Sequence, residues 1–419
     1  MRRATWVRGL VGAFLALVML VIGFFAGVEA ERNAVLPGSI VREPADAAPV
    51  ASVFWQSWNL VKEHYVDRTA VEPKRMIYGA VGGMLDSLGD AGHTRFLSPE
   101  DLRMEREVLA GTLEGIGAEL GIRGGQPIIV APIPGSPAQR AGVRPGDVIV
   151  RVDGREVVGL TIQQIVNLVR GPAGTSVTLT VLHRGDTTLT DITIVRAKIT
   201  VPNVSWIILP ETEVAHVLIS QFGERTANQL AAALTDARAN GATAIILDLR
   251  NNPGGLLNEA VGVASQFLSG GNVLLSQDAQ GRRTPYAVQP GGVALDMPVV
   301  VLINEGTASS AEIVAGALQD HQRGPLIGIT SFGTGTVLST YPLKDGSAIL
   351  LGTDEWLTPN GREIWHHGVT PDQSVALPPD AVPLIPNEES GMTAVQLQAS
   401  QDQQLLTALR EITSSASTP

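Results

Sequence analysis

Two stretches near the start of the chain carry apolar side chains at the spacing of amphipathic helices. The first places Phe54, Trp58 and Val61 three or four residues apart, which puts them on one helix face. The second, "PKRMIYGAVGGMLDSLG", begins at a proline and closes at a glycine, which are typical start and stop signals of a helix. We expect a small helical cap over residues 50–110, after a polar linker over residues 31–49.

The pattern changes at residue 111 to short runs of β-branched residues separated by turns. Segments such as "RPGDVIVRVDGREV" and "TSVTLTVLHRGDTTLTDITIVRAKI" have the composition of strands bounded by Gly and Asp. Roughly five or six strands and two short helices fit into this stretch. Residues 111–198 are therefore predicted to form one compact module.

Beyond residue 198, predicted strands and helices alternate. "ATAIILDLRNNPGG" is an apolar strand followed by a glycine turn, and "LLNEAVGVASQFL" is a helix. "MPVVVLINEGTASS" and "AEIVAGALQDH" repeat that order. Such alternation indicates βαβ units and a mostly parallel sheet, with ligands at the carboxyl ends of the strands. We predict a mixed α/β, multidomain protein with a core over residues 199–380 and a C-terminal helix and tail over residues 381–419.

The first thirty residues have the pattern of a membrane anchor or a signal peptide. Arg2, Arg3 and Arg8 precede an uncharged apolar run over residues 9–28. About twenty residues at 1.5 Å each span a bilayer, and a cationic flank stays in the cytoplasm. We expect residues 1–30 to be a retained anchor; the alternative is a signal peptide cleaved near "VEA". Both interpretations place the rest of the chain outside the cytoplasm.

Composition narrows the classes of partner and cofactor. The formal net charge is −11, which argues against a nucleic-acid partner because phosphate binding needs an excess of Lys and Arg. Cysteine is absent, which excludes disulfides, thiolate metal sites and a catalytic thiol. His, Asp and Glu show no spacing that predicts a metal site. We expect no metal and no cofactor.

The turn "GTASSAEI" presents a candidate nucleophile, Ser309, at the end of a strand and the start of a helix. The first N–H groups of a helix lack partners and carry a positive partial charge, so the Ser310 amide is placed to hold an oxyanion. The "NNPGG" turn offers a second amide, from Gly254 or Gly255. The alternative is that the hydroxyls of Thr307, Ser309 and Ser310 only cap the helix.

The module over residues 111–198 resembles a PDZ domain. The resemblance is carried by Gly115, Ile116, Gly117 and Ala118 before a strand, by "GSPAQRAGV" and by "GDVIVRVDG". It implies that the module binds a peptide as an added strand, with successive backbone N–H groups around the glycines receiving a terminal carboxylate. The alternative is that the glycines merely form turns. The predicted partner is the C-terminus of a protein or peptide.

The order of motifs resembles the carboxyl-terminal processing peptidases, tail-specific serine proteases of exported compartments. The matching stretches include "LGDAGHTRFLSPED", the PDZ-like module, "DLRNNPGGLL", "NEGTASSAEIVAGALQD", "SFGTGTV" and "LTPNGREIWHHGVTPD". The resemblance covers nearly all of residues 54–375 and implies that Ser309 is the nucleophile. The family's base is a lysine in a T-F-G-K-G-x-V-Q turn, but this chain has Thr334 in place of the lysine and Leu338 in place of the glutamine.

Neither replacement can take a proton from serine at neutral pH, because a hydroxyl is a weak base and an isobutyl group is none. His366 and His367 are the first substitutes to test, because by analogy with the family their loop lies near the site. Lys344 is expected in a solvated turn, and His321 is expected to cap the end of a helix. Three further side chains are expected in other roles, namely Glu312 facing water, His93 as a structural hydrogen-bond partner, and Asp248 in an ion pair with Arg250.

Two functions are compatible with these residues. The first is an exported, membrane-anchored serine endopeptidase that cleaves proteins near their C-termini after recognition by the PDZ-like module, with catalysis impaired by the loss of the base. The second is a non-catalytic scaffold that binds protein C-termini without cutting them.

Overall fold

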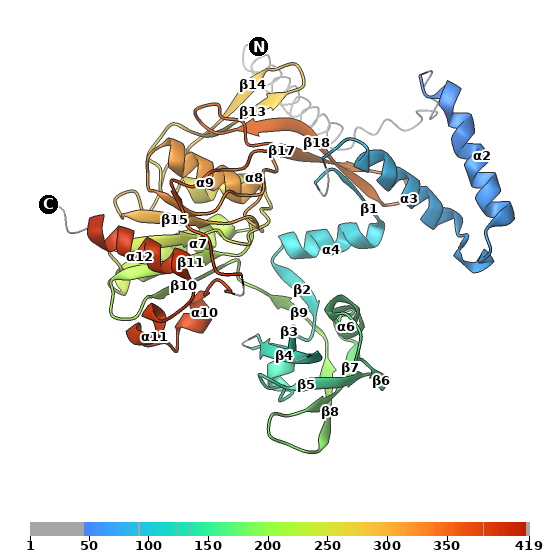
Figure 1. Cartoon of the computed structure of the whole chain (residues 1–419), viewed down its shortest axis with the longest axis horizontal. Coiled ribbons are helices and arrows are strands. Elements are labelled where there is room, and N and C mark those ends of the chain that lie inside the picture. Colours follow the sequence, from blue (N-terminus) through green and yellow to red (C-terminus); the bar gives the residue numbers. More distant parts are fainter. Residues whose placement is uncertain (1–45, 91–92, 124, 134, 380, 416–419) are drawn as a thin grey trace, which may run out of the picture. The chain divides into compact units, whose positions relative to one another are not determined.

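The computed structural model describes residues 46–415 except 91–92, 124, 134 and 380 (Figure 1). The predicted anchor or signal, and most of the predicted linker, lie outside these residues. None of the helices that the structure describes has the length and apolarity needed to cross a bilayer. The chain divides into two compact units, Met1–Met76 and Ile77–Pro419.

Both helices predicted near the start are present. They are α2 (Ala48–His64) and α3 (Pro73–Asp86), separated by the short 3₁₀ helix η1 (Arg68–Ala70). In α2 the Trp55 side chain is 55% exposed, so this unit does not bury the predicted apolar face by itself. The predicted boundaries of the cap stay predictions.

The second unit includes a short strand and a helix before the PDZ-like module. Strand β1 (Arg95–Leu97) leads into α4 (Pro99–Leu109). Ser98 and Asp101 form a reciprocal capping box, which satisfies two N–H groups at the start of α4. The apolar side of this segment packs with β18 (Ala348–Leu357) around Leu97 and Leu102.

The PDZ-like module is a β-sheet with two helices, as predicted. Its sheet order is β3-β4-β5-β7-β8, and β6 pairs with β5. Strands β2 and β9 form an antiparallel ribbon, so the chain enters and leaves the module side by side. Ile129, Ile149 and Ile165 are fully buried in its core. The elements are β2 (Thr112–Gly115), β3 (Ala118–Arg123), β4 (Gln126–Pro132), α5 (Pro137–Arg140), β5 (Val148–Val152), β6 (Arg155–Glu156), α6 (Ile162–Val169), β7 (Ser176–Leu182), β8 (Leu189–Val195) and β9 (Ala197–Thr200).

The predicted parallel sheet forms the centre of the core, in the order β10-β11-β12-β15-β16-β19. Only β10 pairs antiparallel in this sheet, and the other pairings are parallel. The strands and the helices that follow them are β10 (Val204–Ile208), β11 (Val214–Ile219), α7 (Thr226–Ala239), β12 (Ala244–Asp248), α8 (Leu257–Ala264), β15 (Val299–Ile303), α9 (Ser310–Asp320), β16 (Leu326–Gly328) and β19 (Gln373–Ser374).

Both faces of this sheet are covered, which explains why its strands are apolar at nearly every position. Alternate residues such as Ile245 and Leu247 pack against α7, α8 and α9. The residues between them, such as Ile246, pack against the C-terminal helices. Those are α10 (Pro386–Glu389), α11 (Ala394–Gln398) and α12 (Gln403–Ser415), so the predicted C-terminal helix is present and its apolar side is part of the core.

A second sheet was not among the predicted elements. Its main path is β1-β18-β13-β14, and β17 also pairs with β18. All its pairings are antiparallel. Its further strands are β13 (Asn272–Asp278), β14 (Arg283–Ala287) and β17 (Thr336–Pro342). Lys344 lies in the turn between β17 and β18, as its sequence predicted.

Two neighbouring valines in the PDZ-like module provide a test of its packing. Val157 is 0% exposed and Val158 is 65% exposed. Val157→Ala should lower the free energy of unfolding by about 1.5–3 kcal/mol, because buried methyl groups are lost and a cavity remains. Val158→Ala should change it by less than about 0.5 kcal/mol. Urea denaturation of both full-length variants measures the difference, and equal effects would contradict this packing.

Candidate active site

The two glycine-containing turns lie side by side at the carboxyl edge of the parallel sheet. Residues 251–255 follow β12, and residues 304–309 follow the neighbouring strand β15. The Asn251 N–H donates to Asn304 Oδ1 at 2.8 Å, and the Asn304 side-chain amide donates to Asn251 Oδ1 at 2.8 Å. These bonds fix the two turns to one another.

Ser309 stands at the N-terminal boundary of α9 in a backbone conformation that L-residues rarely adopt. Its φ is 53° and its ψ is −121°. Such conformations cost on the order of 1–3 kcal/mol and persist where the surrounding structure determines them. A Cβ atom on Gly254 would lie 2.6 Å from Ser309 Cβ, so the close approach of the first turn requires glycine at that position.

The hydroxyls of Thr307 and Ser310 do not cap α9. Thr307 Oγ1 donates to the Leu249 carbonyl at 2.8 Å, and Ser310 Oγ donates to the Gly255 carbonyl at 3.0 Å. Both hydroxyls therefore link the Ser309 turn to the segment that follows β12. Among the described residues, neither hydroxyl accepts an N–H group of α9, and Thr307 Oγ1 accepts the Asn304 N–H instead, so the interpretation of these two residues as helix caps was wrong.

Two backbone N–H groups near Ser309 are available to an external acceptor. Within the described residues, the N–H groups of Gly255 and Ser310 have no acceptor in the protein. The Gly254 N–H is already used, because it donates to Asn252 Oδ1 at 2.8 Å. Of the two glycines considered, Gly255 is thus the better oxyanion donor. The catalytic roles assigned to Ser309, Ser310 and Gly255 stay predictions.

Gly255 also has a conformation and a position that exclude other residues. Its φ is 140°, and a Cβ atom would lie 2.4 Å from the Phe222 carbonyl oxygen. The same Phe222 carbonyl accepts the Leu256 N–H at 2.7 Å. The first turn is thereby held against the loop that follows β11, which fixes the direction of the Gly255 peptide.

Glu312 does not face water, contrary to the expectation from its place on the helix. Its side chain is 0% exposed. Oε1 accepts the Ser331 hydroxyl at 2.6 Å and the Gly333 N–H at 2.6 Å. Oε2 accepts the Ser309 N–H at 2.8 Å and the Thr334 N–H at 3.0 Å. Burial raises the pKa of the Glu312 carboxyl, although these four donors act in the opposite direction.

One carboxylate therefore joins the backbone of the predicted nucleophile to the backbone of the predicted base position. The sequence contains a signal for the contact between Glu312 and Ser309. Ser309 and Glu312 have the S-x-x-E spacing of a capping box, in which the glutamate accepts the N–H of the cap residue. The contacts with residues 331–334 have no such signal, because they depend on how the chain returns to the site.

The two residues at the base and support positions have different environments. Thr334 is buried and lies two residues before the start of β17. Leu338 lies in β17 and packs against an apolar cluster that includes Leu97, Leu102 and Leu350. The structure gives Leu338 a packing role, and neither side chain supplies an amine.

None of the substitute bases bonds to the candidate nucleophile. In the part of the chain that the structure describes, no hydrogen bond or ion pair joins Ser309 to a His or Lys side chain. The His366 N–H donates to the Gly333 carbonyl at 3.0 Å, but its ring is exposed and stacks on Trp365. His367 is also exposed, and the His321 ring bonds to the Asn272 carbonyl at 2.8 Å.

His93 has the structural contact that its sequence predicted. Its Nδ1 lies 2.5 Å from Thr336 Oγ1, at the start of β17. Burial lowers the pKa of His93, with the nearby Asp90 acting in the opposite direction. This histidine therefore connects the segment before α4 to the strand that follows Thr334.

The predicted peptide-binding residues run from the end of β2 to the start of β3, with Gly115 as the last residue of β2 and Ala118 as the first of β3. The Ile116 carbonyl accepts the Ala138 N–H at 2.8 Å, and the Gly117 carbonyl accepts the Ile133 N–H at 2.9 Å. Gly117 has a φ of 73°, and a Cβ atom there would lie 2.5 Å from the Ser136 side chain. Within the described residues, β3 pairs only with β4, so its other edge is open to an added strand. The roles of Gly115, Ile116, Gly117 and Ala118 stay predictions.

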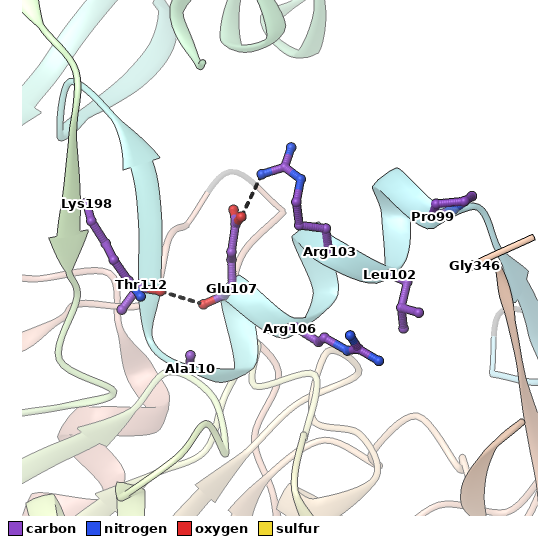
Figure 2. A pocket seen from close by; sticks show the side chains of 9 residues that line it. All are labelled: Pro99, Leu102, Arg103, Arg106, Glu107, Ala110, Thr112, Lys198 and Gly346. Atoms are coloured by element: carbon purple, nitrogen blue, oxygen red, sulfur yellow. Dashed lines mark hydrogen bonds and ion pairs between the residues drawn. The ribbon is translucent and has the colours of Figure 1, made fainter. Parts of the chain in front are cut away.

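A separate surface pocket of about 330 Å³ lies beside α4 and the β2–β9 ribbon (Figure 2). Arg106 and Lys198 line it, and Arg103 forms an ion pair with Glu107 at its edge. Neither Ser309 nor Thr334 lines this pocket. It is therefore not part of the candidate active site.

Replacement of Glu312 tests whether its carboxylate organises the site. In Glu312→Gln the side-chain amide has only one acceptor oxygen, so some of the four groups that donate to the Glu312 carboxylate lose their acceptor. We expect the free energy of unfolding to fall by about 1–3 kcal/mol, the cost of buried donors without acceptors. Glu305→Gln is the control, because Glu305 is exposed on the same turn. Urea denaturation measures both, and similar values would contradict the organising role.

The chain is similar to known proteases over most of its length. Residues 213–375 match peptidase family S41, and residues 128–182 match the PDZ domain. The chain is 34% identical over 323 residues to the carboxy-terminal processing protease CtpA of Bacillus subtilis, which covers 77% of this chain and 68% of the relative. It is 37% identical over 330 residues to the carboxy-terminal-processing protease of Bartonella bacilliformis, which covers 78% of this chain and 75% of the relative.

A solved structure of an S41 protease homologue from Bacteroides fragilis shares the fold alone. It is 17% identical, has a TM-score of 0.54, and covers 85% of this chain and 96% of its own. The predicted resemblance and the predicted mixed α/β class with a PDZ domain are confirmed. By its identity to these relatives and the share of them that it covers, this chain belongs to the carboxy-terminal processing proteases, serine proteases of family S41 that carry a PDZ domain.

Proposed function

We propose that this chain is a serine endopeptidase in which Ser309 is the nucleophile. The observation that carries the proposal is the strained Ser309 turn with the unused N–H groups of Gly255 and Ser310 beside it. Ser309 Oγ attacks the scissile carbonyl, and the two amides hold the oxyanion that forms. The leaving amine departs with a proton, and water then hydrolyses the acyl-enzyme to restore the serine.

In the described part of the chain, no amine or imidazole bonds to Ser309 to accept its proton. Thr334 stands where relatives of this type are expected to have lysine, and Leu338 cannot accept or donate. A general base contributes roughly a hundred- to ten-thousand-fold to such reactions. Oxyanion stabilisation and substrate positioning remain without it. The proposed enzyme is therefore slow, and its rate is limited by proton removal.

The proposed substrate is a protein with an accessible C-terminus. The open edge of β3 can pair with an extended peptide, and the backbone around Gly117 can receive the terminal carboxylate. The net charge of −11 argues against nucleic acid as a partner. The PDZ domain therefore fits recognition of a C-terminal peptide, with cleavage at Ser309.

The second candidate is a scaffold that binds C-termini without cutting them. The observation that favours it is the joint replacement of base and support by Thr334 and Leu338, while no His or Lys in the described part of the chain bonds to Ser309. Both functions use the same PDZ domain. They differ only in whether Ser309 is acylated.

Cleavage of an unstructured protein with an apolar C-terminus separates the two functions. We expect the purified wild type to cleave slowly and Ser309→Ala to show no cleavage above background. Thr334→Lys, with Leu338→Gln as a second change, should raise the rate by roughly 10²–10⁴, because an amine base is restored. The Ser309→Ala change in that background is the control for contamination.

The pattern of results identifies the function. Slow wild-type cleavage that depends on Ser309 supports the endopeptidase. Cleavage only after Thr334→Lys supports the scaffold. Wild-type cleavage that persists in Ser309→Ala would exclude Ser309 as the nucleophile.

We also propose an extracytoplasmic location with an N-terminal anchor, supported by the apolar run over residues 9–28 behind three arginines. After expression in a bacterial host, the full chain should remain in the membrane fraction after an alkaline salt wash, with residue 1 or 2 at its N-terminus by mass spectrometry. A soluble product that begins near residue 31 would show a cleaved signal. Recovery of the intact chain in the cytoplasm would contradict both forms of the proposal.

A further inference from the structure

Five ionisable side chains are buried together behind the turn that carries Gly255. His216 lies in β11, Asp248 ends β12, and Arg250 follows it by two residues. Glu389 ends α10, and Asp402 precedes α12. Each of the five is at most 3% exposed. Buried charges persist only when they are paired, so this cluster (the buried charge network) must be held in a defined arrangement.

Arg250 connects the catalytic turn to the C-terminal segment. Its guanidinium donates to Asp248 at 2.6 Å through Nη2 and to both oxygens of Asp402 at 2.8 and 2.9 Å through Nη1. The ion pair of Asp248 and Arg250 was predicted. The bond to Asp402, 152 residues away, was not.

Asp402 is in turn held by the C-terminal segment. Its carboxylate accepts the Leu405 N–H at 3.0 Å, at the start of α12, and the Leu384 N–H at 2.9 Å. Arg250 is followed directly by the turn of residues 251–255. The order of contacts therefore runs from the C-terminal segment through Asp402 and Arg250 to the backbone that presents the Gly255 N–H.

His216 completes the network and requires a proton on both ring nitrogens. Nδ1 lies 2.9 Å from Glu389 Oε2, and Nε2 lies 3.1 Å from Asp248 Oδ2. A carboxylate can only accept, so both ring nitrogens must donate. The network then contains two cations, His216 and Arg250, with three carboxylates, and loss of the His216 proton would leave one cation in a closed interior.

Burial alone would lower the pKa of His216, but the hydrogen bonds to Asp248 and Glu389 raise it to about 9. Burial alone would raise the pKa of Asp248, but Arg250 and His216 hold it well below its ordinary value. A histidine with a raised pKa in the fold contributes stability that is complete below its ordinary pKa, roughly 6.5. That contribution is lost as the pH rises through about 9.

We propose that residues 384–412 fix the position of the turn over residues 251–255 in the catalytic centre. Asp402, Arg250 and His216 are the positioning residues that hold this turn. The proposal rests on the proposed role of Gly255 in catalysis. The apolar side of α12 would keep the segment on the sheet without these charges. Asp402 holds Arg250, the residue that precedes the turn, with both of its carboxylate oxygens. The Gln404 side chain at 3.2 Å and the Leu384 carbonyl at 3.4 Å also accept from Arg250.

The first experiment measures amide hydrogen exchange in the full-length protein. Exchange across residues 254–256 is read at the two bonded N–H groups, those of Gly254 and Leu256. In Asp402→Asn we expect their exchange to accelerate about tenfold or more, because the turn opens locally when Arg250 loses a buried partner. Asp296→Asn is the matched control, because it removes the exposed partner of Arg238 at the surface. Unchanged exchange at 254–256, with acceleration confined to residues 384–412, would overturn the proposal.

The pH dependence of the same exchange tests His216. In the wild type, the protection of residues 254–256 relative to the unfolded chain should fall as the pH passes about 9. In His216→Gln, protection should be lower at pH 7 and should show no step near pH 9, because the titrating group is absent. If protection in His216→Gln still fell near pH 9, another group would be responsible for that fall, and the proposed role of His216 would be overturned.

Kinetics in the Thr334→Lys background give an independent readout. Asp402→Asn should lower kcat by about 10- to 100-fold and leave KM within about twofold, because the oxyanion contact is made only in the transition state. A change in KM alone would overturn the positioning role. If neither the wild type nor the Thr334→Lys protein cleaves, the proposed endopeptidase function fails, and the exchange experiments still decide whether the network holds the turn.

Discussion

The buried carboxylate of Glu312 is the interaction on which the candidate site depends. It accepts two N–H groups from the turn before β17, one hydroxyl from that turn, and the N–H of Ser309. A carboxylate without a cation is costly to bury, and this one is retained because its hydrogen bonds are satisfied within the site. It follows that the strained Ser309 backbone and the position of Thr334 are fixed by the same group.

The bonds that hold the turn do not depend on the side chain that would act as the base. The N–H of Thr334 holds Glu312 whatever side chain stands there, because the bond uses the backbone. A change from lysine to threonine can therefore remove the base and leave the turn in place. Leu338 is compatible with the fold for another reason, because it packs with apolar residues of β1, α4 and β18. The fold therefore does not require lysine at position 334 or glutamine at position 338.

The parallel sheet supplies the second constraint, since it places both glycine-containing turns of the candidate site at one edge. Its two faces are closed by different parts of the chain, with α7, α8 and α9 on one and the C-terminal helices on the other. In the described part of the chain, the buried charge network joins the sheet to the C-terminal segment through charged side chains. The C-terminal segment thereby has two kinds of attachment, an apolar one to the sheet and an ionic one to the residue that precedes the Gly255 turn.

Local patterns in the sequence were sufficient for much of the fold. Alternating strands and helices predicted the parallel sheet, and the glycine turns after β12 and β15 predicted where the site lies. The S-x-x-E spacing contained the Ser309 to Glu312 contact. The second sheet was not predicted, because its strands pair across long sequence separations and carry mixed polar and apolar residues. The burial of Glu312 was also missed, since helix position alone does not reveal which loop will cover a side chain.

The sequence by itself determined the classes of element, the family, the candidate nucleophile and the absence of lysine at position 334, because these are properties of residues near one another in the chain. Only the tertiary structure decided which donors surround Glu312, that Gly255 rather than Gly254 has an unused N–H, and that Asp402 meets Arg250. Those contacts join residues tens to hundreds of positions apart. They exist because packing of the sheet and its covering helices brings buried polar groups together, where each must find a partner.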